Sequence, residues 1–254
     1  MHSAVTHFNK RDDIRNTWGN KVLLQQYGMK LIFFLGLAFN KDLQVLIDQE
    51  SRENADIVQG NFLDSYTNIT HKAVLWLRWV TENCPDARTV LKLDDDVFVN
   101  VFSFHHYLPL FELSTKRIWC EVRPVGTQPI QRKTIHKWRV AEHELKGLTY
   151  YPLTLCRGYF VILTIETVRE MYEAAKETPF FWIDDFYVFG TLANKTGSQF
   201  SSLKLFLAKA DDAVSCFASS NTACQLMGVL LHVESKDAMK MFWKYTLQQQ
   251  NSIS

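Results

Sequence analysis

The sequence predicts an α/β protein, because short apolar runs that suit buried strands alternate with segments whose apolar residues recur at helical spacing. The clearest strand is residues 30–38, KLIFFLGLA. After it, Asn40 is expected to cap a helix that carries Leu43, Leu46 and Ile47 on one face. This alternation is typical of a sheet covered by helices, rather than of a sandwich or a helical bundle.

Further strands and helices follow in the same alternating order. We expect strands at residues 56–59, 88–93, 159–164 and 227–232, and helices at 68–83, 166–175 and from Ser235 onward. Residues 124–152 are polar and basic, which is more typical of a surface loop than of a site. No repeat or linker divides the chain, so we expect one domain over residues 1–254.

Size and charge narrow the class of protein. With 254 residues, 47% of them hydrophobic, the chain can bury a large core as one domain or as two fused halves. The 28 lysines and arginines nearly cancel the 27 aspartates and glutamates, so net charge gives no reason to expect nucleic acid or an anionic membrane as a partner. The chain has no run of about 18 apolar residues, as a membrane-spanning helix needs, and no signal peptide at its start.

The cysteines and the glycosylation sequons bear on the cellular compartment. None of the five cysteines lies in a CxxC pair, which argues against a cysteine-rich metal site. Cys216 and Cys224 flank FASSNTA, which could turn as a hairpin and bring them into a disulfide; the alternative is two half-buried thiols. An odd number leaves at least one cysteine outside any disulfide. Asn68 and Asn194 begin N-x-T triplets that carry glycans only in a secretory protein.

Three consecutive carboxylates, Asp94, Asp95 and Asp96, directly follow the expected strand at 88–93. Ligands of open α/β sheets bind beyond the carboxyl ends of the strands. Adjacent carboxylates repel one another, and a divalent cation such as Mg²⁺ or Mn²⁺, shared with a substrate phosphate, would relieve that repulsion. The alternative is a solvated acidic turn that caps the following helix.

Two further features are candidates for a site. Asp184 and Asp185 lie within the aromatic stretch FFWIDDFYVFG, where apolar neighbours would raise a carboxylate pKa towards that of a general base. Their alternative role is to stabilise a helix N-terminus. His232 ends the expected strand at 227–232, where its imidazole is either structural or a ligand.

Several longer motifs, in this order along the chain, resemble those of the β-1,3-glycosyltransferases, which include β-1,3-galactosyltransferases, β-1,3-N-acetylglucosaminyltransferases and, more distantly, fringe enzymes. Residues 11–18, RDDIRNTW, resemble the opening motif RxxIRxTW, and residues 33–36, FFLG, the first long strand. Residues 56–72 resemble the block D-x-x-Q-x-x-F-x-D-x-Y-x-N-L-T-x-K. Residues 92–100, KLDDDVFVN, resemble the metal motif KxDDDvFvN.

The resemblance implies a GT-A type fold, with a mixed central sheet flanked by helices. It implies a nucleotide-sugar-binding half at residues 1–110 and an acceptor-binding half at 111–254. In this family Asp94 would face the ribose, Asp96 would bind Mn²⁺ against the pyrophosphate, and Asp95 would support both. His232 resembles the C-terminal histidine that completes the metal shell.

The resemblance also implies further site residues. Residues 184–187, DDFY, resemble the motif E-D-V-Y/F, whose second acid is the catalytic base, so Asp185 is the candidate base. Arg11, Arg15 and Lys72 match basic family positions near the donor, where they would pair with phosphate or bridge a carboxylate.

The resemblance implies an inverting, metal-dependent transfer of a hexose from a UDP-sugar, with galactose the expected sugar. The acceptor would be a hydroxyl of a glycan on a glycoprotein or glycolipid, and the product would carry a β-1,3 linkage. Family members are usually type II proteins of the Golgi membrane with the catalytic domain in the lumen. This chain starts ten residues before Arg11, so we expect the anchor to lie outside this sequence.

One departure from the family pattern supports an alternative. The motif YPxYcsGxGYvlS reads here YPLTLCRGYF at residues 151–160, with one glycine gone and Arg157 introduced. A catalytically inactive carbohydrate-binding or chaperone-like relative is therefore the second hypothesis. A nuclease or phosphoryl transferase built on the acidic cluster is a third, but the chain has no P-loop and no basic groove signature.

Overall fold

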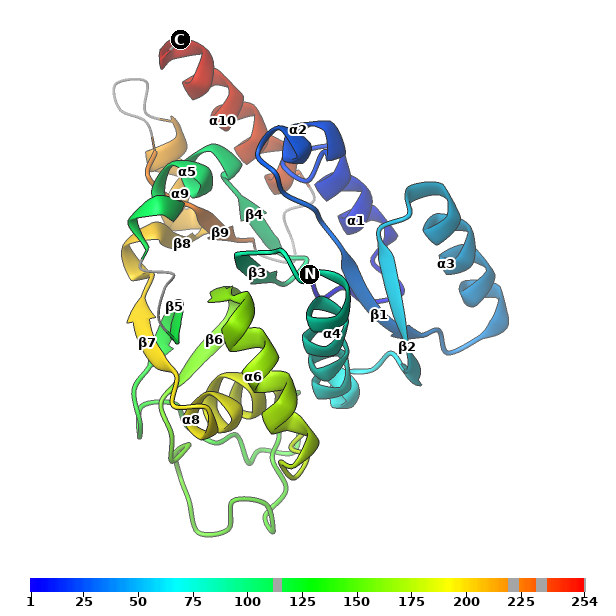
Figure 1. Ribbon diagram of the computed structural model, residues 1–254, viewed down its shortest axis with the longest axis vertical. Coiled ribbons are helices and arrows are strands. Elements are labelled where there is room, and N and C mark those ends of the chain that lie inside the picture. The colour runs from blue at the N-terminus through cyan, green and yellow to red at the C-terminus, as the bar shows by residue number, and fades with distance from the viewer. Residues whose placement is uncertain (112–115, 219–223, 232–236, 254) are drawn as a thin grey trace. The chain divides into compact units, whose positions relative to one another are not determined.

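The computed structural model describes residues 1–111, 116–218, 224–231 and 237–253. The chain folds into two compact units, each assembled from segments that are far apart in the sequence (Figure 1). Unit 1 comprises Met1–Gln59, Leu93–Glu112 and Leu203–Ser254, and unit 2 comprises Gly60–Lys92 and Leu113–Ser202. The assignment of residues 1–110 and 111–254 to donor and acceptor binding stays a prediction.

Unit 1 holds two small sheets and most of the short helices. Its helices are α1 (Phe8–Arg15), α2 (Lys21–Gln26), α3 (Lys41–Asn54), α5 (Val101–Tyr107), α9 (Ala210–Ala218) and α10 (Ala238–Ile253), with 3-10 turns η2 (Leu108–Leu110) and η4 (Lys204–Phe206). Strand β1 (Phe33–Leu37) pairs with β2 (Ile57–Leu63), which runs on into unit 2. In the second sheet, β9 (Gly228–Leu230) lies between β4 (Val97–Val99), antiparallel to it, and β8 (Leu207–Lys209), parallel to it.

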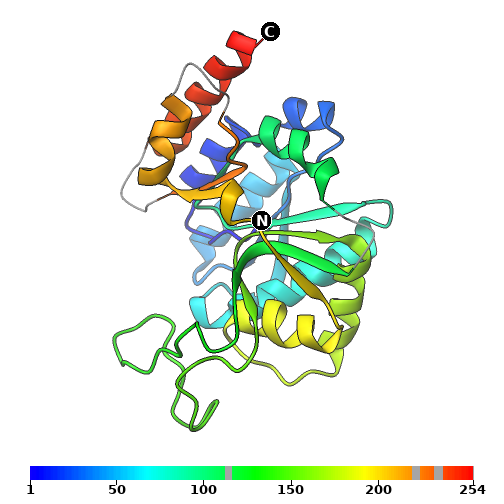
Figure 2. The same ribbon diagram turned by 90° about the vertical axis from the view of Figure 1, so that its left-hand side faces the viewer.

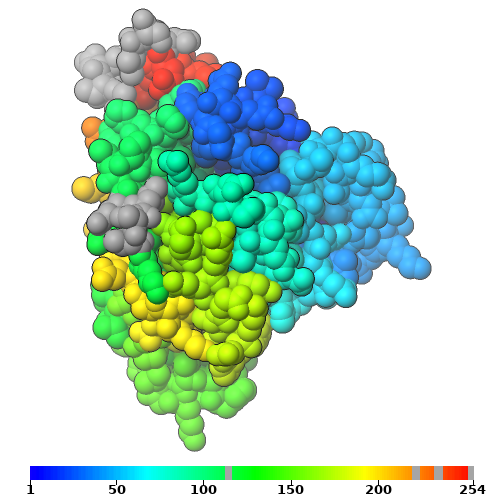
Figure 3. All heavy atoms as spheres, in the orientation of Figure 1, coloured from blue at the N-terminus to red at the C-terminus, as the bar shows by residue number. Residues whose placement is uncertain are grey.

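Aromatic side chains form part of the core of unit 1. Phe98 of β4, Phe217 of α9 and Phe242 of α10 are buried and contact one another, with ring centroids 5.1–5.8 Å apart. Helices α9 and α10 accordingly lie side by side (Figure 2). Helix α3 lies at the surface of the unit (Figure 3), and only Ile47 and Glu50 among its side chains are buried. This core fixes β4, and therefore the end of the acidic turn that precedes it.

Unit 2 is built on one mixed sheet. The strand order is β3 (Thr89–Leu93), β6 (Leu155–Thr164), β5 (Arg117–Arg123) and β7 (Gln199–Ser202). Strand β5 runs antiparallel to β6 and parallel to β7. The helical segments are η1 (Tyr66–Asn68), α4 (Ile69–Asn83), α6 (Ile165–Lys176), α7 (Asp184–Phe186), the π-helical η3 (Tyr187–Leu192) and α8 (Ala193–Lys195). Helix α4 packs on α6, and both α6 and α7 contact β6.

The α/β prediction is confirmed, with mixed sheets and flanking helices. Asn40 caps α3, its side chain accepting a hydrogen bond from the backbone of Leu43 at 2.8 Å. Residues 124–152 contain no helix or strand and form a long loop (Figure 2). Ser235, expected to cap the last helix, is outside the described residues. No helix in the described ranges is long and apolar enough to span a membrane.

Some elements have no clear sequence signal. Helix α1, FNKRDDIR, has only Arg11 and Ile14 buried, so it lacks the apolar period that reveals a helix. Strand β2 extends to Leu63, beyond the expected end at residue 59, and β6 begins at Leu155 instead of at residue 159. The early start of β6 is set by pairing with β5, in which Leu155 lies opposite Arg123, and the local sequence does not report such pairing.

Two disulfides are formed. Cys216 bonds Cys224, as one of the two sequence interpretations expected, although Cys216 lies in helix α9 and not in a hairpin strand. Cys120 bonds Cys156 and joins the adjacent strands β5 and β6. This second disulfide was not predicted because the two cysteines are 36 residues apart. Cys84 keeps its thiol.

Candidate functional site

The three aspartates form a turn between β3 and β4, directly after a strand as expected. Asp95 is buried and saturated with partners. Its carboxylate accepts from the Ser3 hydroxyl at 2.7 Å, contacts His7 Nδ1 at 2.7 Å and accepts from Lys10 Nζ at 3.1 Å. Burial would raise the pKa of Asp95, but these contacts lower it to about 2. Asp95 is therefore an ionised anchor of the turn.

Asp96 is in the opposite situation. Its Oδ1 is buried and has no hydrogen-bond partner in the part of the chain that the structure describes. Burial and then the neighbouring charge of Asp94 raise the pKa of Asp96 to about 6. Asp94 is 35% exposed at its side chain and lies 3.9 Å from His2 Nδ1. A buried, unbonded carboxylate oxygen beside a second carboxylate fits a hard divalent cation.

The chain returns to Asp96 at the end of β9. Leu231 donates its backbone N–H to the carbonyl of Asp96 at 2.8 Å, continuing the antiparallel pairing of β4 with β9. His232, the predicted metal ligand, is the next residue but lies outside the described residues. Among the residues that are described, no group of three or more His, Cys, Asp and Glu side chains has metal-binding geometry. The metal role of Asp96 and His232 thus stays a prediction.

Arg11 and Arg15, the two basic residues predicted near the donor, engage carboxylates of unit 1. Arg11 is fully buried and forms a bidentate pair with Glu50, with distances of 2.8 and 2.6 Å. Arg15 bonds Glu50 at 2.6 Å and both oxygens of Asp56 at 2.7 and 2.8 Å. Of the two roles considered from sequence, this geometry is that of bridging a carboxylate, and it ties α1 to α3 and to the start of β2.

A surface cavity of about 310 Å³ lies beside this network, between α1 and α3. It is lined by Phe8, Asp12, Leu46, Glu53 and their neighbours.

Lys72, the third predicted basic residue, belongs to unit 2. Its Nζ lies 3.0–3.1 Å from the two carboxylate oxygens of Asp64, and both side chains are buried. A phosphate-binding role for Lys72 stays a prediction.

Asp185, the predicted base, stands in the first turn of α7 in unit 2. Its Oδ1 accepts the backbone N–H of Gly158 at 2.9 Å, and Lys92 Nζ donates to the carbonyl of the same glycine at 2.6 Å. A Cβ at position 158 would collide with Asp185 Oδ1 and lie 3.3 Å from Lys92 Nζ. Any larger residue at position 158 would therefore displace the Asp185 carboxylate, which Gly158 positions while Lys92 holds the glycine.

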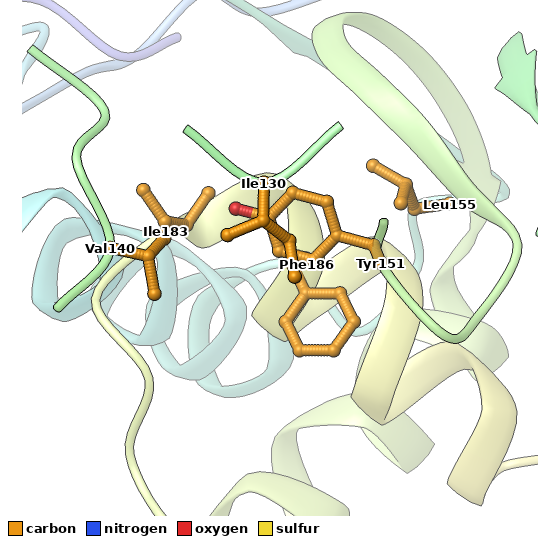
Figure 4. Packing of buried hydrophobic residues seen from close by; sticks show 6 residues of the cluster. All are labelled: Ile130, Val140, Tyr151, Leu155, Ile183 and Phe186. Atoms are coloured by element: carbon orange, nitrogen blue, oxygen red, sulfur yellow. The ribbon is translucent and has the colours of Figure 1, made fainter. Parts of the chain in front are cut away.

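A buried apolar cluster surrounds the segment that carries Asp185. Figure 4 shows its members: Ile130, Val140, Tyr151, Leu155, Ile183 and Phe186. The ring of Tyr151 lies 4.7 Å from that of Phe186. Burial and then the charge of Asp185 raise the pKa of Tyr151 to about 12, so this phenol stays neutral at physiological pH. The cluster holds both flanks of the aspartate pair in place.

The long loop of residues 124–152 is organised by one side chain. The Arg132 guanidinium donates to the carbonyls of Val140, Ala141, Glu144, Leu145 and Leu148, at 2.5–3.5 Å. Since Ile130, Val140 and Tyr151 belong to the apolar cluster, this loop packs on the segment that bears Asp185. Residues 124–152 were expected to form a surface loop, and their polar, basic composition does not reveal this packing.

Comparisons with known proteins agree with the motifs. The sequence profile of a family described as Galactosyltransferase matches residues 9–204. Beta-1,3-galactosyltransferase 5 of Homo sapiens is 31% identical over 73% of this chain and 59% of its own length. The lactosylceramide 1,3-N-acetyl-beta-D-glucosaminyltransferase A of Xenopus laevis is 32% identical over 78% of this chain and 53% of its own length. The chain thus spans little more than half of these relatives.

Among solved structures, a glycosyltransferase involved in glycosylation of the major capsid of PBCV-1 aligns over 84% of this chain and 98% of its own, with 11% identity and a TM-score of 0.39.

Proposed function

We propose that this chain, which belongs to the galactosyltransferase family, transfers a hexose from a UDP-sugar to a hydroxyl of an acceptor glycan and forms a β-1,3 linkage. The names of both relatives specify 1,3-linked sugar transfer, one of galactose and one of N-acetylglucosamine. Galactose is the proposed sugar because the family carries that description. The acceptor is proposed to be a glycan on a glycoprotein or glycolipid.

One observation carries the proposal: the buried, unbonded carboxylate oxygen of Asp96 beside Asp94. Such an oxygen is costly to keep ionised unless a cation binds it. Asp96 and His232 would hold Mn²⁺, with Asp94 and Asp95 supporting the nucleotide side. When bound, the ion would supply Lewis-acid stabilisation of charge on the departing UDP.

The proposed base is Asp185. The acceptor hydroxyl oxygen would form a bond to the anomeric carbon of the donor while the bond from that carbon to the UDP oxygen breaks. The hydroxyl proton would pass to the Asp185 carboxylate, and attack from the face opposite UDP would invert the anomeric configuration. The hydrogen bond from Gly158 to Oδ1 orients the carboxylate for this transfer.

The proposed compartment is the Golgi lumen. Two disulfides suit an oxidising compartment, since disulfides are rare in reducing ones. The second hypothesis, an inactive relative, was motivated by the altered glycine motif. Gly158, the glycine that remains, is in contact with both Asp185 and Lys92. That contact favours an active enzyme over an inactive relative.

A transfer assay tests the function directly. The chain would be incubated with UDP-galactose or UDP-N-acetylglucosamine and a β-galactosyl or β-N-acetylglucosaminyl acceptor, with and without Mn²⁺. We expect a β-1,3-linked product that needs both the metal and the acceptor, and loss of turnover in Asp185→Asn and Asp96→Ala. Asp48→Asn, an exposed carboxylate on α3, is the matched control and should retain turnover. Full turnover in Asp185→Asn would refute the assignment of the base.

A further inference from the structure

A cluster of charged side chains lies on the paired strands β5 and β6. Glu121 is directly opposite Arg157 in the strand register. Its Oε1 accepts from Arg123 at 2.6 Å, and its Oε2 accepts from the phenol of Tyr159 at 2.8 Å. Arg157 reaches Oε1 only to 3.6 Å, which is too far for a hydrogen bond. The Glu121 carboxylate therefore accepts hydrogen bonds from one guanidinium group and one phenol, and a second guanidinium group lies near it without a hydrogen bond.

The cluster has more cationic donors than it uses. Its two arginines and one glutamate leave a net charge of +1. Arg157 is 40% exposed at its side chain and donates no hydrogen bond within the described part of the chain. The Nε of Arg123 is buried and likewise has no partner there. A guanidinium carries five N–H donors in a planar fork that matches carboxylate and sulfate oxygens.

The position of the cluster links it to the proposed acceptor side. Arg157 directly precedes Gly158, whose backbone N–H holds the proposed base Asp185. Adjacent residues of a strand present their side chains to opposite faces, so Arg157 does not point at the reacting hydroxyl. Arg157 is also the residue that replaces a glycine-motif position of the family pattern. The charge is therefore a property of this chain and not of the shared motif.

From these contacts we propose that Arg157, together with Arg123, binds an anionic group on the acceptor glycan, a sugar carboxylate or a sulfate, at a position away from the reacting hydroxyl. This inference rests on the proposed function only in that the bound glycan is taken to be the acceptor. The binding of an anion does not depend on that function. Glu121, which accepts a hydrogen bond from the Tyr159 phenol, holds Arg123 in place, and Arg157 supplies the unused donors. The anion would accept hydrogen bonds from the exposed guanidinium of Arg157 and would be attracted by the charge of Arg123 beside it.

The test compares three acceptors that differ in one group: a neutral β-galactosyl disaccharide, its sulfated form and its uronic-acid form. We expect kcat/KM for one or both anionic forms to exceed that for the neutral form, and Arg157→Gln to reduce this ratio about tenfold, as for one lost charge-assisted hydrogen bond. Arg157→Lys should keep part of the ratio because it keeps the charge. Arg78→Gln, an exposed arginine on α4 paired with Glu82, should keep the wild-type ratio.

Direct binding separates this inference from the proposed reaction. Ligand-observed NMR of the same disaccharides, without UDP-sugar or metal, should show binding of an anionic form that Arg157→Gln weakens. Suppose that the chain transfers sugar, but that the ratio of kcat/KM for anionic over neutral acceptors is the same in wild type and in Arg157→Gln. The inference then fails and the function stands. If no sugar is transferred but the Arg157-dependent binding is present, the function fails and the site stands. A change in UDP-sugar KM alone would mean that the cluster serves the donor, and would overturn the inference.

Discussion

Gly158 and Asp185 are joined by a hydrogen bond that leaves no room for a side chain at position 158. The glycine donates its N–H to Asp185 Oδ1, and Lys92 binds the glycine carbonyl from a neighbouring strand. The carboxylate proposed as the base is thus positioned by backbone atoms of β6, which move less than side chains do. This arrangement makes the position of Asp185 sensitive to a single methyl group.

We expect Gly158→Ala to reduce kcat/KM by about 100-fold, because the new Cβ would displace Asp185 and misalign the proton acceptor. Displacement of the buried contacts should also cost about 1–3 kcal/mol of unfolding free energy. Steady-state kinetics and thermal unfolding check the two effects. As a control, Gly126→Asn changes a glycine whose Cβ position has no atom within 4 Å, and asparagine tolerates its positive φ of 76°. Wild-type turnover in Gly158→Ala would show that the contact does not position the base.

The buried carboxylate of Asp96 gives a prediction about metal binding that does not depend on activity. Asp96→Asn removes a buried charge that repels Asp94, so the metal-free protein should be as stable as wild type, or more stable by about 1–3 kcal/mol. Added Mn²⁺ should raise the Tm of the wild type and should not raise that of Asp96→Asn. Differential scanning fluorimetry with and without Mn²⁺ measures both shifts.

The same experiment has an internal comparison. Asp95→Asn removes a carboxylate that three side chains stabilise, so it should lower the stability of the metal-free protein. A lower stability in both variants, with an equal Mn²⁺ shift, would contradict the different roles assigned to Asp95 and Asp96.

Sequence patterns predicted the parts of the fold that depend on neighbours along the chain. The strand around Phe33, the Asn40 cap and the acidic turn after β3 all follow from local spacing. The partners of Asp95 did not follow, because Ser3, His7 and Lys10 lie 85–92 residues away. No local pattern reports a hydrogen bond across that separation.

The predicted site residues show the same limit. Motif matching selected Arg11 and Arg15, but only the tertiary structure identifies Glu50 and Asp56 as their partners. Gly158 was noted as part of a motif, yet its contact with Asp185 depends on the packing of α7 against β6. Residue types therefore indicated the chemistry, and the fold determines which groups meet.

Arg132 is predicted to hold the loop of residues 124–152 in its conformation. Arg132→Met removes the donors to carbonyls of Val140, Ala141 and Glu144, which would then lack partners. We expect amide hydrogens of the loop to exchange at least about tenfold faster, since one charge-assisted hydrogen bond is worth roughly 1.5–3 kcal/mol. Hydrogen exchange measured by mass spectrometry tests this. Arg139→Met is the control, because Arg139 makes only a 3.4 Å contact with a loop carbonyl.

The Arg11–Glu50 pair predicts a specific loss of stability at low pH. Burial would raise the pKa of Glu50, but hydrogen bonds and charges from Arg11 and Arg15 lower it overall. A carboxylate whose folded pKa is below its unfolded value of 4.5 stabilises the protein above that value, and this contribution falls as the pH drops through the folded pKa. Glu50→Gln should therefore cost about 3 kcal/mol at pH 7, because Arg11 stays buried without its counter-charge, and progressively less as the pH falls below 4.5 and through the folded pKa of Glu50.

Chemical denaturation at pH 7 and at a series of lower pH values measures this difference. Other carboxylates also titrate in this range, so the comparison is with Glu53→Gln, which makes the same charge change at an exposed position of α3. The cost of Glu53→Gln should be small at every pH of the series. The cost of Glu50→Gln should shrink towards it as wild-type Glu50 becomes protonated. A cost of Glu50→Gln that did not decrease at any pH down to acid unfolding would contradict the stabilising role of the ion pair.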